Sequence, residues 1–355
     1  TSRIFQMIES LAMPERDTAA EQIGRRLRLR VPRADGTLYA VPPLEGAPGM
    51  ARDNHEQLAA ATVDLQGRRL DVLRAAARRH LCRAARDYTG TWTDVPPCTD
   101  ATELVYVTGH QPLLFHPGVW VKNFVAARLA EMPQALSINL VVDNDTMSSA
   151  SLRIPLGDRD RPRFGTLPFD DGHPARPWEG AEILNRPRFE NFGHDVAEAM
   201  QPWGVHPLIE QLWPLVLERA QHSNQLADCF TAARNQIERQ WGVENLELPI
   251  SRMCDSETFL WFVSPIVAPL PRFRTVYNEA LAEYRATNKV RSRTHPVPEL
   301  KRRDDWLEAP FWIWRDGSYE RRRVFARPAG KQIELSDGRD VFATLPLSAD
   351  GEACC

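Results

Sequence analysis

The sequence predicts an α/β protein with a mainly parallel sheet, helical appendages and a β-hairpin region at its carboxyl end. Three observations predict this fold. Strand-like runs alternate with helical periods between residues 101 and 290, polar loops follow two of those runs, and paired short strands replace this pattern after residue 290. Alternating strands and helices are typical of parallel sheets, because the return to a parallel strand needs a long crossover connection.

The first predicted βαβ unit occupies about forty-five residues. An apolar run, Leu104–Val107, precedes the loop Gly109-His110-Gln111-Pro112, and an apolar helical pattern then covers Val119–Met132. A second apolar run, Leu136–Val142, ends in Asp143-Asn144-Asp145. We expect the two runs to be adjacent parallel strands joined by a right-handed crossover. Both loops would then lie at the carboxyl ends of strands, where open α/β sheets bind ligands.

The remaining core elements follow from shorter patterns. Two short strands, Ser151–Leu156 and Phe164–Phe169, flank a polar turn, and the Pro-rich stretch 174–192 is predicted to be irregular. Apolar residues at helical spacing predict helices over His206–Arg219 and Asn224–Trp241. A further strand and two helical segments complete the core, and prolines separate the two segments: Leu246–Ile250, a helix capped by Ser256, and its continuation from Phe273 to Tyr284.

We expect three regions along the chain. Residues 1–100 form a helical appendage that includes one long helix over Asn54–Tyr88, residues 101–290 form the core with a helical insertion at about 206–241, and residues 291–355 are β-rich. Two hairpins are expected in the last region, turning at Asp316-Gly317 and at Ser336-Asp337-Gly338. The chain starts at Thr1 and stops at Cys355, soon after a strand-like run, so we expect a fragment of a longer protein.

Composition narrows the class of protein. Hydrophobic residues make up 43% and charged residues 26% of the chain, and 44 basic against 47 acidic residues create no overall field that would direct it to nucleic acid or to an anionic membrane. No apolar run of about 18 residues and no signal-peptide core is present. The six cysteines fit neither zinc-site spacing nor a disulfide framework. A cytoplasmic enzyme without a structural metal is expected, and a homo-oligomer stays open.

Functional side chains gather in and just after the first loop. Gly109 permits close approach of the backbone to a ligand, and His110 and His116 are able to donate to phosphate oxygens or to act as acid or base. Lys122 falls in the first turn of the predicted helix, whose amino-terminal dipole end favours an anion. We expect His110 and His116 to be catalytic and four residues to bind a ligand: Gly109, Gln111, Lys122 and Asn123. The alternative, loop histidines and a lysine that simply face solvent, stays open.

The second loop adds two carboxylates. Asp143 and Asp145, one residue apart, suit a hydrated divalent cation that bridges to a diphosphate, or the hydroxyls of a ribose. We expect Asp143 to be catalytic and Asp145 to bind, in one pocket with His110. The alternative is an Asn/Asp cluster that caps the exit of the chain from the strand. The sequence has neither a Gly-x-Gly-x-x-Gly fingerprint nor a Walker lysine, so no dinucleotide site or P-loop is predicted.

A family resemblance covers residues 104–146. The segment from Val107 to Phe115, Val-Thr-Gly-His-Gln-Pro-Leu-Leu-Phe, followed by Lys122, resembles the Thr-Gly-Gln-Gln-x-x-Leu-Phe segment of the bacillithiol biosynthesis cysteine-adding enzyme family. The resemblance implies a Rossmann-like core related to nucleotidyltransferases, a helical insertion, and a pocket lined by Gly109, His110, Gln111, Asp143 and Asp145. The chain departs from the family where His110 replaces a Gln and where the acidic loop lacks a His.

These observations lead to one functional expectation. We expect the protein to be a transferase or ligase that acts on a nucleotide-, phosphate- or amino-sugar-derived small molecule. Whether it uses ATP, another nucleotide or a divalent cation as a cofactor stays open. His110 or His116 would stabilise charge on a leaving phosphate that Lys122 and the helix end hold. None of the six cysteines is close to this unit in sequence, so a thiol would enter as a substrate.

Two other classes stay open. An Asp-x-Asp glycosyltransferase would use Asp143-Asn144-Asp145 with a nucleotide-sugar donor. An interaction module would use the stretch Lys289–Arg327, where eleven basic and six acidic residues alternate with aromatic side chains able to stack on nucleic acid. The favoured interpretation of that stretch is structural, with the aromatic side chains on the buried face of a hairpin and the arginines on the other face. Nucleic acid is therefore not the expected partner.

Overall fold

The structure is a computed structural model that describes residues 33–34, 37–95, 102–114, 116–172, 176–314 and 320–347. The chain divides into two compact units, residues 1–50 and 51–355. The described part of the first unit contains a short 3-10 helix, η1 (Leu44–Gly46), and the first residues of α3 (Ala47–Ala60). The helices expected before residue 33 and the Asp316-Gly317 turn lie outside the described residues. All that follows concerns the second unit.

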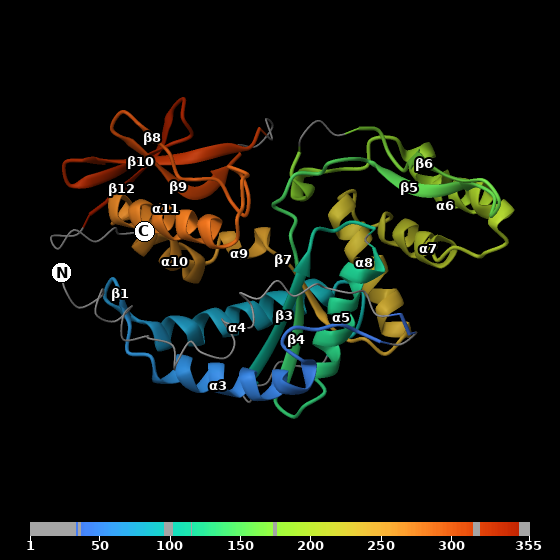
Figure 1. Cartoon of the computed structure of the whole chain (residues 1–355), viewed down its shortest axis with the longest axis horizontal. Coiled ribbons are helices and arrows are strands. Elements are labelled where there is room, and N and C mark those ends of the chain that lie inside the picture. The colour runs from blue at the N-terminus through green and yellow to red at the C-terminus, as the bar shows by residue number, and fades with distance from the viewer. Residues whose placement is uncertain are drawn as a thin grey trace. The chain divides into compact units, whose positions relative to one another are not determined.

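A three-stranded parallel sheet forms the centre of this unit. Its strands are β3 (Leu104–His110), β4 (Ala135–Val141) and β7 (Leu246–Pro249), in the order β3-β4-β7. Helix α5 (Pro117–Leu129) connects β3 to β4 and packs against both (Figure 1). The predicted βαβ unit is therefore confirmed, with Val107 opposite Ile138 in the parallel register.

The strand order limits what the fold itself says about ligands. The three strands run from one edge of the sheet to the other in chain order, so the described sheet has no point at which the order reverses. In Rossmann folds the ligand crevice lies at such a reversal. An α/β fold with a parallel sheet is established, whereas the Rossmann-like assignment remains a prediction.

Helices cover the two faces of the sheet with different chemistry. Because side chains alternate along a strand, Ile138 and Leu248 point to one face, where they pack against Ala85 of α4 (Leu70–Thr89). Asn139 and Glu247 point to the other face, towards α5 and α8 (Leu226–Gln240). Helix α4 therefore packs on the central sheet.

The prediction of one long helix over Asn54–Tyr88 is wrong. Helix α3 ends at Ala60, and a short hairpin of β1 (Asp64–Leu65) and β2 (Arg68–Arg69) precedes α4. Gly67 has a φ of 81° and donates its N–H to the Asp64 carboxylate at 2.8 Å, which closes a turn that interrupts the helix. Arg68 pairs with Glu257 at 2.7 Å and stacks on Trp261. Arg68 therefore binds within the protein.

A large insertion separates β4 from β7. It contains the hairpin β5 (Ser151–Gly157) and β6 (Pro162–Pro168), which is confirmed, and three α-helices with two 3-10 turns: η2 (Trp178–Gly180), α6 (Arg186–Met200), η3 (Gln201–Trp203), α7 (Ile209–Arg219) and α8. Helices α7 and α8 are those predicted. Helix α6 was not predicted, and part of it lies in the stretch 174–192 that is predicted to be irregular. Its signals are an Asn185 cap that accepts from the Arg188 N–H at 3.1 Å and buried Phe189 and Phe192.

Close packing in the insertion depends on a glycine in α6. A Cβ built at Gly193 would lie 2.8 Å from the Cβ of Trp213 on α7, a buried side chain that cannot move away cheaply. We expect Gly193→Ala to lower the free energy of unfolding by about 1–3 kcal/mol through overpacking, measured by urea denaturation. Gly172→Ala is the control, because nothing lies within 4 Å of a Cβ there. Equal stability of the two variants would contradict the packing argument.

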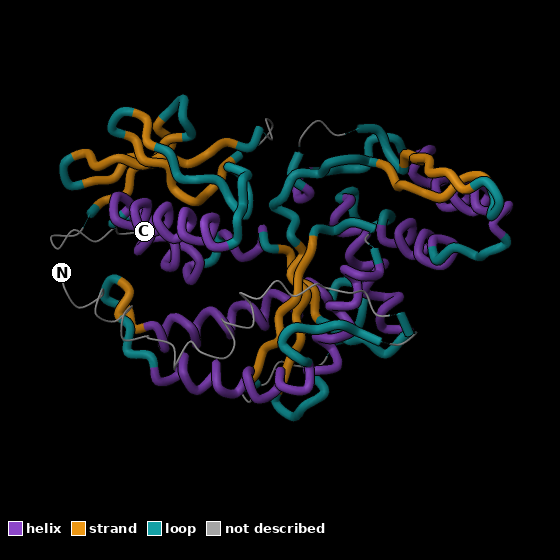
Figure 2. The backbone as a smooth tube through the Cα atoms, in the orientation of Figure 1, coloured by secondary structure: helices purple, strands orange, loops and turns teal. Residues whose placement is uncertain are grey.

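The carboxyl-terminal part pairs two helices with an antiparallel sheet (Figure 2). After the short α9 (Ser251–Cys254) come α10 (Glu257–Val267), whose Ser256 cap is confirmed, and α11 (Leu270–Thr287). The five strands have the order β12-β11-β10-β9-β8 and are β8 (Arg302–Arg303), β9 (Trp306–Ile313), β10 (Arg322–Ala329), β11 (Gln332–Ser336) and β12 (Val341–Pro346). The β11–β12 hairpin is the one predicted at Ser336-Asp337-Gly338.

The arginines and aromatic residues of this sheet engage one another. Arg323 lies over Trp312 and pairs with Glu308, and Arg327 lies over Trp306 and pairs with Glu334. The arginines are therefore held within the sheet, which favours a structural role for this stretch. The predicted separation into a buried aromatic face and a basic face is wrong, because Arg323 and the 41% exposed Trp312 are directly paired and lie on the same face. Among the described helices, none combines the length and the apolar character needed to cross a membrane.

Candidate functional site

Acidic side chains converge where β4 and β7 end. Asp143 follows β4 and is buried, with 3% of its surface exposed. Its two carboxylate oxygens accept from Ser251 at the start of α9, one from the backbone N–H at 3.0 Å and one from the hydroxyl at 2.5 Å. The contact joins the carboxyl ends of two neighbouring parallel strands, and this is the edge at which α/β sheets bind ligands.

The 3-10 turn η2 brings a third acidic residue to this edge. The backbone N–H of Glu179 donates to the carbonyl of Asp143 at 2.9 Å, and that of Trp178 donates to the carbonyl of Asp145 at 3.0 Å. Trp178 is buried in the insertion core with 1% of its surface exposed, which anchors the turn. The segment after β6 therefore lies along the segment after β4, with Glu179 beside Asp143.

Glu179 is placed to titrate near neutrality. Burial, followed by the charge of Asp143, raises the pKa of Glu179 to about 7. A hydrogen bond from the Trp314 side chain opposes the rise, and Asp255 adds to it. Burial also raises the pKa of Asp143, against the hydrogen bonds from Ser251. A carboxyl group with a pKa near 7 is suited to take up and release protons at physiological pH.

A cysteine that sequence proximity does not reveal lies in the same cluster. Burial, then the charges of Glu179, Asp143 and Asp255, raise the pKa of the Cys254 thiol. Cys254 is a free, half-buried cysteine. Cys254 is far from the first loop in sequence, as expected, but α9 carries it to the cluster in space. Its raised pKa keeps the thiol neutral, which is the opposite of what a nucleophilic cysteine needs.

Asp145 links the acidic cluster to two other segments. One of its oxygens accepts from Arg321, just before β10, at 3.1 Å and from the Thr146 N–H at 2.8 Å. The other accepts a short hydrogen bond from the side chain of Gln111. The Arg321 guanidinium also lies 4.6 Å from the centre of the Trp312 ring. Gln111 and Asp145, both predicted to bind, are thus brought together.

The other predicted residues of the first loop are held by their own segment. His116 caps α5, with its Nδ1 accepting from the Gly118 N–H at 3.0 Å, and Lys122 donates to the carbonyl of Gly109 at 2.9 Å. The half-buried His110 ends β3 directly beside β4, and its Nδ1 is 3.3 Å from the carbonyl oxygen of Gln111. The capping side chain of His116 thus occupies the first N–H of α5, and phosphate binding at this helix end remains a prediction.

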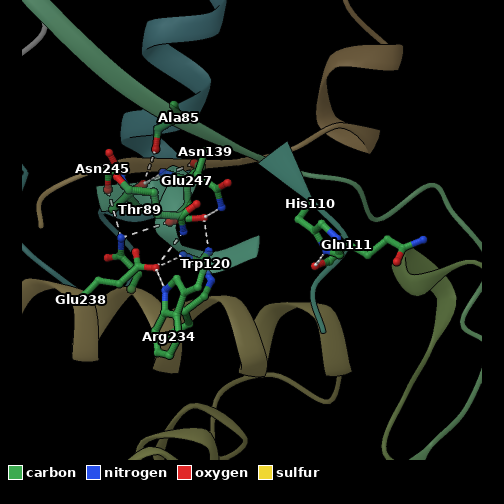
Figure 3. A network of polar contacts seen from close by, with 12 residues as sticks. Ala85, Thr89, His110, Gln111, Trp120, Asn139, Arg234, Glu238, Asn245 and Glu247 are labelled. Atoms are coloured by element: carbon green, nitrogen blue, oxygen red, sulfur yellow. Dashed lines mark hydrogen bonds and ion pairs between the residues drawn. The ribbon is translucent and has the colours of Figure 1, made fainter. Parts of the chain in front are cut away.

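Asn123 belongs to a buried network of hydrogen bonds and ion pairs and not to the acidic cluster. Its side chain donates to Glu238 at 2.7 Å, and Arg234 bridges Glu238 at 2.8 Å and Glu247 at 2.5 Å. Figure 3 shows the carboxylates of this network around Arg234, with His110 and Gln111 lying apart from it. Trp120 also donates to Glu238, and Asn139 and Asn235 donate to Glu247. Burial raises the pKa of Glu247 despite the neighbouring Arg234.

The described residues do not favour a cation between the two aspartates. No group of three metal-ligating side chains occurs among them. Each carboxylate oxygen of Asp143 and Asp145 already accepts from a protein donor. The Asp-x-Asp pattern therefore serves here to join strand ends and neighbouring segments, which is close to the capping interpretation.

Five residues of the site come from segments that the sequence does not connect with the first loop: Glu179, Cys254, Asp255, Trp314 and Arg321. No local pattern marks Glu179, which sits in a Pro-rich stretch, and its character depends on burial and on the neighbouring carboxylates. Comparison of the chain with models of known protein families and with curated protein sequences found no match.

Proposed function

We propose that the chain is an enzyme of the transferase or ligase class whose active site is the acidic cluster at the carboxyl ends of β4 and β7. Glu179 acts as its general base. The observation that carries the proposal is the position of Glu179, whose backbone N–H donates to the carbonyl of Asp143 at the strand ends. Burial and the charge of Asp143 raise the pKa of Glu179 to about 7 there. Strongly shifted pKa values at the ligand-binding edge of a parallel sheet are typical of catalytic sites.

The charges of the acidic cluster favour some of the expected substrates over others. Four carboxyl groups gather there, while Arg321 and Arg252 are the basic groups that act on Asp145 and Asp143. An acidic site attracts ammonium and hydroxyl groups and repels phosphate. The substrate is therefore a molecule that carries amine or hydroxyl groups, for example an amino sugar. The cluster does not bind a phosphate group of the substrate.

In this mechanism the carboxylate of Glu179 takes the proton of the attacking hydroxyl, amine or thiol as that group bonds to an electrophilic atom of the second substrate. The bond from this atom to its leaving group breaks in the same step, and the leaving group departs with the bonding electrons. Asp143, held by Ser251, keeps the pKa of Glu179 high, and the Trp314 side chain orients its carboxylate. A thiol amino acid, which the family resemblance implies, would enter as the attacking group. The half-buried Cys254 thiol takes no part in bond formation.

The experiment is a titration with 1-amino-1-deoxysorbitol, whose ammonium stays charged between pH 6 and 8, against uncharged sorbitol. With a pKa of about 7, Glu179 is roughly one-tenth ionised at pH 6 and nine-tenths at pH 8, so the amine should bind roughly tenfold more tightly at pH 8. Calorimetry would measure the dissociation constants.

Two variants make the titration specific. Glu179→Gln should lose the pH dependence of amine binding, whereas Glu283→Gln on the exposed face of α11 should keep it. The proposal fails if the wild-type protein binds the amine equally well at both pH values, or if Glu179→Gln keeps the full pH dependence.

A further inference from the structure

An apolar cavity of about 270 Å³ lies between the insertion and the first loop, and none of the residues of the acidic cluster lines it. Its walls come from the loop after β3, the start of α5, strand β5 and helices α6, α7 and α8. Thirteen of the fifteen lining residues are apolar, and the other two are Arg153 and Arg234. Cavities of this size and lining are typical of small-molecule sites.

The two arginines of the cavity differ in their surroundings. Arg234 is buried on α8, and its charge is met by Glu238 and Glu247. Arg153 is an exposed residue of β5 that also lines the cavity, and its guanidinium lies 4.0 Å from the centre of the Phe164 ring on β6. Within the described part of the chain, no carboxylate forms an ion pair with Arg153.

We propose that this cavity binds a small amphipathic monocarboxylate, a medium-chain acyl or arylalkyl acid. Its apolar body fills the space between Trp120, Leu113 and Leu208, and its carboxylate pairs with Arg153 at the mouth. An apolar body leaves the polar groups of a ligand outside, where a guanidinium is the natural partner of a carboxylate. An ammonium head group would meet like charge at the same place.

The cavity also lies next to the first loop. Leu113 and Leu114 of its wall follow Gln111, whose side chain holds Asp145. A bound acyl chain would restrain this loop, but the site itself does not depend on the role proposed for Glu179. Glu179→Gln should therefore bind the carboxylate as the wild type does, so the two proposals fail independently.

The test is calorimetric titration with butanoate, hexanoate and octanoate, and with octan-1-ol and octylamine as head-group controls. Each added methylene should tighten binding by about fourfold, which is the factor for burying one such group. Octanoate should bind at least tenfold more tightly than octylamine. The same affinity for all chain lengths, or for all head groups, would overturn the proposal.

Matched variants locate the ligand. Leu208→Trp and Leu113→Trp fill the cavity from opposite walls and should each weaken octanoate binding at least tenfold, whereas Leu184→Trp, at an exposed position outside the lining, should not. Arg153→Met should abolish the preference for octanoate over octan-1-ol, and Arg163→Met on the paired strand should retain it. Octanoate binding that survives both cavity-filling variants would place the ligand elsewhere and reject the inference.

Discussion

Replacing Glu179 by Gln should lower turnover of the substrate by about 10²–10⁴, the usual contribution of a positioned general base. The amide cannot accept the proton, yet it keeps the size of the side chain and its ability to accept from Trp314. Folding should persist, because the carboxyl group is costly in its charged form at this buried place. The measurement is kcat/KM against pH, where the wild type should show an inflection near pH 7 that the variant lacks.

A second variant tests the origin of that inflection. Asp255 raises the pKa of Glu179, so Asp255→Asn should move the inflection to lower pH and leave the maximal rate largely unchanged. Glu283→Gln, far along α11, should leave both the rate and the inflection as in the wild type. Full turnover by Glu179→Gln, or an inflection near pH 7 that persists in it, would remove Glu179 from catalysis.

Replacing Arg234 by Met should lower the free energy of unfolding by about 3–5 kcal/mol, the cost of breaking a buried ion pair from one side. The guanidinium bridges two carboxylates that are 0% exposed, and Met fills a similar volume without neutralising them. Urea denaturation should measure the loss. Arg128→Met is the control, because its exposed pair with Glu131 on the protein surface should contribute no more than about 1 kcal/mol.

The loss should depend on pH in a defined direction. The pKa of Glu247 lies above its ordinary value in the folded chain, so its contribution to stability is present at low pH and is lost as pH rises through the folded pKa. Removing Arg234 raises the folded-state pKa of Glu247 further, so the protein continues to lose stability up to a higher pH. The deficit of Arg234→Met should therefore be larger at pH 8 than at pH 5, and adding Glu247→Gln should reduce it. An equal deficit at both pH values would contradict this account.

Local patterns predicted most of the elements that build the core. The apolar runs at Leu104–Val107 and Leu136–Val142 became adjacent parallel strands, and the helical periods over 206–241 became α7 and α8. Such periodicities depend only on which face of an element is buried, which the sequence records directly. Where the pattern was ambiguous the prediction was wrong, as at α6 and at the turn that Gly67 makes.

By itself the sequence determined where strands end and which polar residues follow them, so the acidic loop Asp143-Asn144-Asp145 and its partner Gln111 could be found without coordinates. Only the tertiary structure decided which groups face those residues. Glu179, Cys254 and Arg321 come from the insertion, from α9 and from the segment before β10, and their neighbours depend on how these segments pack. The pKa of a carboxyl group depends on its burial and on the charges around it, and both are properties of the assembled fold.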